Sequence, residues 1–215
     1  MIVHALEDYM LKSEAVLSGH PKASTKQAIE RAALSLFAER SYSAVSMREI
    51  AERVGIRQGG IYNHFGSKQA LLVHLMEGHM RALLVALDAS VPKGGNPRHQ
   101  LAQFVRFHVL YHLTQPDDVF IAYMELRSLE PDGLARLKEL RRAYEGRLRR
   151  ILEAGQRLGV FAITDVPVQA MGLIAMLTGV TTWYHDGGRL TREQVADIYA
   201  AMVMRSLDVE EAEKS

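Results

Sequence analysis

Residues 54–71 read VGIRQGGIYNHFGSKQAL, and this stretch decides the fold. A short helical pattern ends at Gly55, a residue type that adopts the left-handed conformation at helix C-termini without strain. A second short pattern follows, in which Ile61 and Phe65 share one helical face before Gly66 ends it. Two short helices joined by a tight turn predict a helix-turn-helix.

Two N-cap signals precede this stretch. Ser24 with Gln27, and Ser46 with Glu49, each place a hydroxyl residue three positions before a Gln or Glu, which is the capping-box pattern. The first box opens a helix over residues 25–39, whose apolar residues repeat with helical spacing. The second opens the short helix that ends at the glycine. The sequence therefore predicts a supporting helix followed by the two arms of the motif.

The second arm carries side chains suited to double-stranded DNA. Arginine, glutamine and asparagine match base edges in the major groove, and tyrosine and lysine contact phosphates. A glycine inside a helix costs roughly 1 kcal/mol relative to alanine, and the pair at 59–60 would allow close approach to a phosphate strand. Residues 24–70 hold seven Lys and Arg against four Asp and Glu. The predicted DNA contacts are Ser46, Arg48, Arg57, Gln58, Gly59, Gly60, Tyr62, Asn63, His64 and Lys68.

This motif, placed after one helix and before a long helical remainder, resembles the TetR family of one-component transcriptional regulators. The resemblance is close over residues 24–75, where the tyrosine, the aromatic before Gly66 and the Ser67-Lys68 pair match the family pattern. The sequence departs from the family pattern at Gly59-Gly60 and at Asn63. These departures bear on which operator sequence is recognised. The resemblance implies about nine helices, with an N-terminal three-helix DNA-binding domain and a larger C-terminal domain for ligand binding and dimerisation.

The rest of the chain is helical in pattern. No alternating run is long enough for a strand, so the expected fold class is all-α. Turn signals divide the remainder into predicted helices over residues 68–89, 98–114, 117–129, 133–158, 166–185 and 191–207. The predicted domains are an N-terminal extension at 1–23, the helix-turn-helix domain at 24–70, the ligand-binding and dimerisation domain at 71–208 and an acidic tail at 209–215.

Composition narrows the function classes. The chain has 215 residues, a net charge of +1 and no cysteine, which excludes disulfides, thiol catalysis and zinc fingers. Charged residues interrupt the apolar stretch at 2–16, so we expect neither a signal sequence nor a membrane span, and a cytoplasmic location. No nucleophile and base motif and no phosphate-cradling loop supports the rival interpretation of an all-helical enzyme. We therefore predict no enzymatic activity, no cofactor and no metal.

The C-terminal part offers candidate ligand residues. Residues 136–150 carry seven basic and two acidic residues, and Arg141 lies within an apolar stripe. This arginine either pairs with an acid such as Glu125 or Glu130, or meets the acidic end of a ligand together with Arg127. The aromatic residues of this part are equally compatible with plain core. The predicted ligand contacts are Phe104, His108, Tyr111, Met124, Arg127, Arg141, Tyr144 and Trp183.

The last two predicted helices have the composition of an assembly surface. The helix at 166–185 is apolar almost all round and carries small residues that would let two helices approach closely. A second copy would cover it in a two-fold four-helix bundle, and packing within one chain is the alternative. The predicted homodimer contacts are Gly172, Ala175, Gly179, Ile198 and Met202.

Residues 183–191, WYHDGGRLT, together with the arginine-bearing helix, are similar to the C-terminal halves of TetR regulators that respond to acyl-CoA thioesters of lipid, sterol or aromatic acid breakdown. This similarity implies a homodimeric repressor that leaves a palindromic operator when a thioester binds in the larger domain and tilts the helix at 68–89. Two alternatives stay open. One is a multidrug-type apolar ligand, and the other is a helical adaptor that binds protein instead of DNA.

Overall fold

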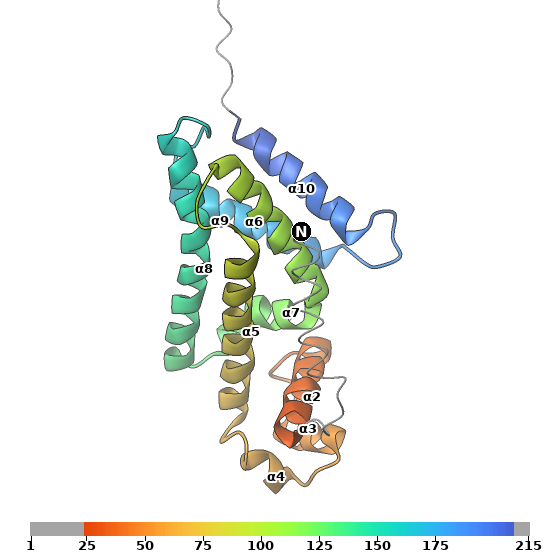
Figure 1. The fold of residues 1–215 in the computed structure, drawn as a ribbon. Coiled ribbons are helices and arrows are strands. Elements are labelled where there is room, and N and C mark those ends of the chain that lie inside the picture. Colours follow the sequence, from red (N-terminus) through yellow and green to blue (C-terminus); the bar gives the residue numbers. More distant parts are fainter. Residues whose placement is uncertain (1–23, 209–215) are drawn as a thin grey trace, which may run out of the picture. The chain divides into compact units, whose positions relative to one another are not determined.

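The computed structural model describes residues 24–208, so the predicted extension at 1–23 and the predicted tail at 209–215 lie outside the described residues. Nine α-helices and two short 3₁₀ helices make up the described part, which contains no strand (Figure 1). The predicted all-α class is confirmed. In chain order the elements are α2 (Thr25–Arg40), α3 (Met47–Val54), α4 (Gln58–Tyr62), α5 (Lys68–Ser90), α6 (Pro97–Thr114), α7 (Pro116–Met124), η1 (Glu125–Ser128), α8 (Pro131–Arg157), α9 (Val166–Thr178), η2 (Gly179–Thr182) and α10 (Arg192–Ser206).

The described chain divides into two compact units. The first unit comprises residues 24–83 and 115–141, and the second comprises residues 84–114 and 142–208. The long helices α5 and α8 each contribute one part to the first unit and the other part to the second. The predicted boundary between residues 70 and 71 separates the DNA-binding part from the rest by function, whereas this division separates the chain by compactness. The functional boundary therefore stays a prediction.

Local signals start and stop the helices. The side chains of Ser24, Ser46 and Thr191 each accept the backbone N–H three residues on, and each N-cap N–H donates to the Gln or Glu side chain at that position. All three capping boxes satisfy N–H groups that the helix itself leaves unpaired. Gly55 ends α3 with a φ of 76°, in the left-handed region where glycine carries no penalty.

Two predicted helices end early. The helix expected over 117–129 becomes α7 and then η1, and the helix expected over 166–185 becomes α9 and then η2. In the second case the hydroxyl of Thr181 donates to the carbonyl of Thr178 at 3.0 Å, which offers the backbone an alternative to the α-helical pattern. In the first case the α-helix stops at Glu125, whose side chain makes a tertiary contact.

A buried carboxylate at this break holds the loop between α2 and α3. Glu125 is 7% exposed, and its Oε1 accepts the N–H of Tyr42 at 2.8 Å while its Oε2 accepts the hydroxyl of Ser128 at 2.6 Å. On the other side of the loop, Lys68 Nζ donates to the carbonyls of Tyr42 and Val45 at 2.9 and 2.8 Å. The same ammonium lies 4.2 Å from the centre of the Tyr42 ring. Both backbone polar groups of Tyr42 are therefore fixed from elsewhere in the first unit.

The second unit is built on α6. This helix packs against α10, α9 and η2, and it buries an aromatic row that includes Phe104, Phe107 and Tyr111. The inner face of α10 supplies small and branched side chains such as Ala196 and Val203. The core of this unit is therefore helix on helix, with the bulky rings on α6.

Helix α5 is the one described helix that is long and apolar enough to cross a membrane by length and composition alone. Of its most apolar window, 44% is buried inside the structure. A single helix of this kind is weak evidence for a membrane span, because core helices of globular proteins pass the same test.

The Glu125 contact predicts a stability change. Glu125→Ala leaves the Tyr42 N–H and the Ser128 hydroxyl without their acceptor in a part-buried place, so the free energy of unfolding should fall by about 1–3 kcal/mol. Urea denaturation measures it. Glu139→Ala removes an exposed carboxylate from α8 and serves as the matched control, with an expected change below about 0.5 kcal/mol. Equal losses in the two variants would contradict the assignment.

Candidate DNA interface and ligand site

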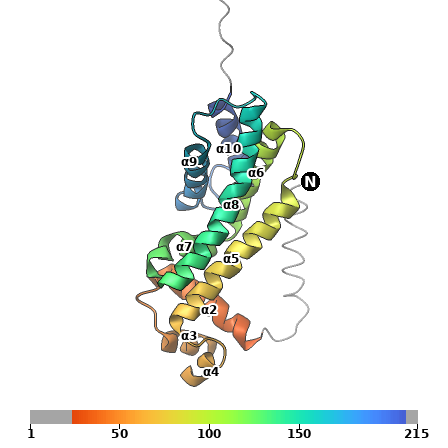
Figure 2. The same ribbon diagram turned by 90° about the vertical axis from the view of Figure 1, so that its left-hand side faces the viewer.

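The outer face of α4 is polar and open. Ile61 and Phe65 point into the core, with 0% and 5% of their surface exposed, while Tyr62 is 47% exposed and Asn63 and His64 are exposed with it. Figure 2 shows α3 and α4 next to one another beside the N-terminal end of α5. The inward and outward faces predicted for the second arm are therefore the ones observed, although α4 itself spans only five residues.

Five polar side chains of this face make no hydrogen bond or ion pair with the described residues. They are Arg57, Gln58, Tyr62, Asn63 and His64. A Cβ added at Gly59 would meet nothing within 4 Å, and one at Gly60 would meet only Ile56 at 3.7 Å. The protein core therefore does not require glycine at either position, and the absence of side chains leaves this face flat.

The other predicted DNA contacts are engaged within the protein. Ser46 caps α3, and Arg48 forms an exposed ion pair with Glu52 at 2.8 Å, one helical turn away. Lys68 uses two of its three N–H donors on carbonyls of the loop between α2 and α3. Its first role is to hold this loop, which sequence reasoning did not predict, and the predicted phosphate contact has only the third donor left.

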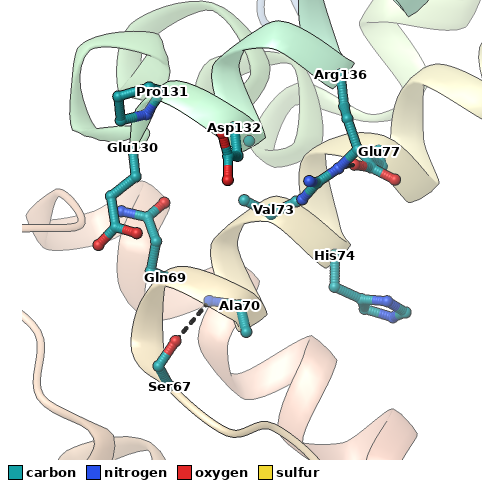
Figure 3. Close-up of a pocket in the computed structure, with 11 residues that line it drawn as sticks. Ser67, Gln69, Ala70, Val73, His74, Glu77, Glu130, Pro131, Asp132 and Arg136 are labelled. Carbon is teal, nitrogen blue, oxygen red and sulfur yellow. Dashed lines mark hydrogen bonds and ion pairs between the residues drawn. The ribbon is translucent and has the colours of Figure 1, made fainter.

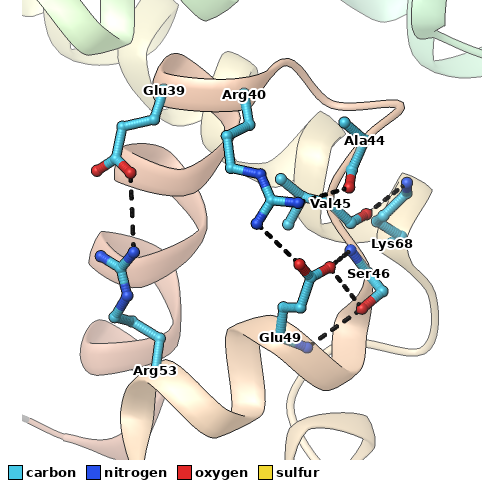
Figure 4. A network of polar contacts seen from close by, with 8 residues as sticks. All are labelled: Glu39, Arg40, Ala44, Val45, Ser46, Glu49, Arg53 and Lys68. Carbon is cyan, nitrogen blue, oxygen red and sulfur yellow. Dashed lines mark hydrogen bonds and ion pairs between the residues drawn. The ribbon is translucent and has the colours of Figure 1, made fainter.

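An exposed polar network ties α2 to α3 (Figure 4). Arg40 donates to Glu49 at 2.8 Å, and Glu49 also accepts the N–H and the hydroxyl of Ser46, both at 2.8 Å. These hydrogen bonds lower the pKa of the Glu49 carboxyl to about 2, and those from Ser46 have the largest effect. Farther along, Arg53 lies 3.7 Å from Glu39. The network joins the C-terminal end of α2 to both ends of α3, and so sets where α3 presents α4.

A cleft of about 670 Å³ lies in the first unit between the N-terminal turns of α5 and α8 (Figure 3). Its lining includes the carboxylates of Glu77, Glu130 and Asp132, and Arg136 in it already donates to Glu77 at 2.8 Å. The excess of carboxylates makes this cleft unsuited to an anionic ligand. Sequence reasoning did not predict the cleft, because its two walls are about sixty residues apart along the chain.

A buried polar network lies in the second unit. His108 is fully buried, with Nδ1 2.9 Å from the hydroxyl of Tyr144 and Nε2 3.2 Å from the hydroxyl of Thr178. Burial lowers the pKa of the His108 imidazole to about 3, so the ring is neutral at pH 7. The His112 ring stacks on it with centres 3.8 Å apart, and the ring of Phe104 lies 5.5 Å from that of Tyr144.

This network uses both nitrogens of His108. The Nδ1–H of His112 donates to the carbonyl of His108 at 2.8 Å. No group of three or more His, Cys, Asp or Glu among residues 24–208 could hold a metal ion. The structure therefore shows this pair of histidines as a hydrogen-bonded core element.

The predicted ligand residues separate into groups. Phe104, His108 and Tyr144 come together, and Tyr111 is buried nearby against Phe107, with ring centres 5.4 Å apart. Trp183 is exposed next to Tyr184 on the segment before α10. Three others, Met124, Arg127 and Arg141, belong to the first unit, where Met124 and Arg127 are exposed.

Of the two alternatives considered for Arg141, the ion pair with an acid is not formed among the described residues. Its guanidinium lies 4.5 Å from the centre of the Tyr123 ring and donates to the carbonyl of Ala122 at 3.3 Å, and among the described residues no carboxylate pairs with it. Glu125, the acid proposed as partner, is occupied by the Tyr42 loop. A π face and a carbonyl of α7 satisfy the charge in place of an acid.

A second cleft, of about 280 Å³, lies in the second unit and was missed by sequence reasoning. Its apolar floor includes Phe104, which is the one residue shared with the predicted ligand set. We call it the basic cleft, since Lys93, Arg147 and Arg150 line it against a single carboxylate, that of Asp88. The basic run at 136–150 was the available signal in the sequence, and Arg147 and Arg150 belong to it.

Helices α9 and α10 each carry exposed large apolar side chains. These side chains are Val168, Met171, Met176, Ile198 and Met202. Gly172 and Ala175 of α9 are exposed as well. Exposed large apolar side chains are typical of interaction surfaces, and four of the five predicted dimer contacts are exposed on these two helices.

Comparison with known proteins covers both parts of the chain. Residues 29–75 match the family described as bacterial regulatory proteins, tetR family, and residues 94–207 match the tetracyclin repressor-like C-terminal domain. The chain is 29% identical over 178 residues to the HTH-type transcriptional repressor KstR2 of Rhodococcus jostii (strain RHA1), an alignment that spans 81% of this chain and 87% of that protein.

Comparison with solved structures gives the same family. A bacterial regulatory protein in the tetR family from Rhodococcus RHA1 is similar with a TM-score of 0.82 and 25% identity, over 88% of this chain and 100% of that one. AibR, solved in complex with isovaleryl coenzyme A and operator DNA, is similar with a TM-score of 0.75 and 26% identity, over 83% of this chain and 97% of that one. The chain belongs to the TetR family and is a transcriptional repressor with an N-terminal DNA-binding helix-turn-helix and a C-terminal ligand-binding domain.

Proposed function

We propose that the chain represses transcription in the cytoplasm as a homodimer on a palindromic operator, and that a CoA thioester bound in residues 71–208 releases it. The DNA-binding part of this proposal rests on the outer face of α4. This exposed surface presents five polar side chains that have no partner among the described residues, namely Arg57, Gln58, Tyr62, Asn63 and His64. Such donors and acceptors are what a base edge or a phosphate requires.

In the proposed complex, α4 enters the major groove. Arg57, Gln58, Asn63 and His64 contact base edges, and Tyr62 contacts a phosphate. Ser46, Arg48 and the third N–H of Lys68 lie beside the backbone. The flat surface at Gly59 and Gly60 faces the sugar-phosphate strand. Two such helices in one dimer occupy successive major grooves about 34–36 Å apart.

The dimer we propose forms through α9 and α10. The exposed side chains of Met171, Ile198 and Met202 are covered when the two helices of one copy meet those of another. Gly172 and Ala175 are exposed in α9, and Gly179, the residue that follows this helix, is half-buried. Small residues of this kind allow close helix contact, and a two-fold four-helix bundle results.

For the effector we propose a CoA thioester. The support is the similarity to AibR, whose solved complex contains isovaleryl coenzyme A, together with the basic cleft, whose charge suits an anionic ligand. A ligand weakens operator binding only by its difference in affinity for the two states of the repressor. We therefore propose that the thioester prefers a state in which α5 holds the two α4 helices at the wrong separation.

Removing side chains from the outer face of α4 should weaken operator binding. Arg57→Ala with Tyr62→Ala should raise the Kd for DNA from immediately upstream of the chain's own coding region at least tenfold, because each lost contact of this kind contributes about 1–3 kcal/mol. Fluorescence anisotropy measures it. Arg142→Ala, which removes an exposed arginine from α8, is the control and should leave the Kd within about twofold. If the double variant dimerises normally and still binds DNA, the interface is elsewhere.

Charges on the α9 and α10 surface should separate the dimer. Ile198→Glu with Met202→Glu would bury two carboxylates, so the dimer dissociation constant should rise roughly a hundredfold or more. Sedimentation equilibrium gives this constant. Leu158→Glu puts the same charge on another exposed apolar residue of the second unit and should leave the dimer intact. A double variant that remains dimeric moves the interface to another surface.

Ligand release tests the effector class. Isovaleryl-CoA and octanoyl-CoA, added to the repressor bound to the upstream DNA, should raise the apparent Kd for DNA at least fivefold, because coupling free energies are typically about 1–3 kcal/mol. Free CoA at the same concentration is the comparison. Release by uncharged apolar compounds alone would replace the thioester with a multidrug-type ligand. Absence of DNA binding even at low salt would favour the adaptor alternative.

A further inference from the structure

We infer that the basic cleft binds the phosphate groups of an amphiphilic ligand, and that it is the phosphate-binding end of the effector site. The inference rests on the proposed function, since it assumes that the effector is a phosphorylated ligand with an apolar chain. It differs from the sequence-based hypothesis, which placed the anion at Arg141 and Arg127. Those two residues belong to the first unit and do not line its cleft, which is rich in carboxylates.

Two arginines of α8 form one wall of the basic cleft. Arg147 and Arg150 are three residues apart and therefore share a helical face. The Nη1 of Arg150 lies 3.6 Å from the point where a Cβ on Gly146 would stand, so this side chain lies back along the helix toward the Arg147 turn. Arg150 is exposed and forms no ion pair with any described residue. Its guanidinium is an available bidentate donor for a phosphate.

The charges of the cleft do not balance. Lys93 and Arg147 both pair with Asp88 Oδ2, at 3.2 and 2.7 Å. Asp88 is the only acid among the lining residues, so three cations face one carboxylate. The excess is about two positive charges within one concave site. A phosphate or diphosphate carries the complementary charge. Its oxygens would accept hydrogen bonds that Arg147 and Lys93 now both direct to the single Oδ2 oxygen of Asp88.

The floor of the cleft is apolar. Leu87, Val91, Phe104 and Ile151 form it, and each is buried. The volume of about 280 Å³ lies just below the range of ordinary ligand pockets, which measure about 300–1,000 Å³. The cleft therefore admits one narrow chain and not a whole thioester. A ligand with phosphates at the cationic rim and an apolar chain over the floor fits both features.

The loop at the mouth is held in place. Gln100 is buried, and its Nε2 donates to the carbonyl of Pro92 at 2.7 Å. The loop then turns through Gly94 and Gly95, the latter with a φ of 97° that favours glycine. No side chain from these two positions enters the mouth. A phosphate can therefore approach the loop backbone as well as the cationic side chains.

The test measures direct ligand binding to the full-length dimer by isothermal titration calorimetry. The probes are octanoyl-CoA, free CoA, octyl phosphate and octanoate, which separate a thioester from a simpler phosphorylated chain and from a chain without phosphate. Arg147→Gln and Arg150→Gln should each weaken octanoyl-CoA binding about tenfold, since each removes hydrogen bonds to a charged group. Asp88→Asn should tighten binding severalfold, because it removes the competing carboxylate.

Arg149→Gln is the matched control. Arg149 lies on the same helix outside the cleft and pairs with Glu145 at 3.7 Å, so the expected change in Kd is less than twofold. Melting temperatures of all variants report folding, and Arg150→Lys should recover part of the affinity if charge rather than packing is responsible. A loss as large in Arg149→Gln as in Arg150→Gln would overturn the site, because it would show only an effect of total charge.

The remaining outcomes separate this inference from the proposed function. If octanoyl-CoA binds and releases the operator but Arg147→Gln and Arg150→Gln bind it as tightly as the parent, the cleft assignment is wrong and the effector class stands. If octyl phosphate binds in an Arg150-dependent manner while no thioester binds, the phosphate site stands and the thioester effector is wrong. If none of the phosphorylated probes binds the parent protein, both are overturned.

Discussion

The hydrogen bond from the Tyr42 N–H to the buried carboxylate of Glu125 is the contact on which the DNA-binding face depends. Lys68 fixes the carbonyl of the same residue, so the loop before α3 has both of its backbone polar groups held. That loop leads to Ser46, which starts α3, and α3 in turn positions α4. A helix that must match base edges needs such external constraints, because five residues of α4 cannot set their own orientation.

The position of Glu125 in the chain gives this contact a second consequence. Tyr42 and Glu125 are 83 residues apart, and the carboxylate belongs to η1, in the C-terminal part that the family assigns to ligand binding. Gln69 of α5 reaches the same turn, where its Nε2 donates to the carbonyl of Ser128 at 2.8 Å. Breaking such bonds costs on the order of 1–3 kcal/mol, which is also the usual size of allosteric coupling. Loss of these two hydrogen bonds would therefore be large enough in energy to alter operator affinity.

Local chemistry explains which features could be predicted from the sequence. Capping boxes, the glycine that ends α3 and the inward positions of Ile61 and Phe65 depend on residues within one turn of one another, and each was predicted. Long-range contacts decided the rest. Lys68 turned inward to two carbonyls, and Arg141 found the Tyr123 ring in place of an acid. The break at Glu125 and the basic cleft likewise join segments that lie tens of residues apart, where spacing along the chain carries no signal.

The charge of α8 shows why a net charge of +1 is a poor guide to ligand chemistry in this chain. Near its N-terminal end, Arg136 donates to Glu77 and faces a cleft rich in carboxylates. Beyond the boundary of the units, Arg147 shares one carboxylate with Lys93, and Arg150 has none. Burial is incomplete along this face, so single ion pairs add little stability. The unequal pairing does create a difference in electrostatic potential along α8. This difference directs an anion to the second unit and away from the first.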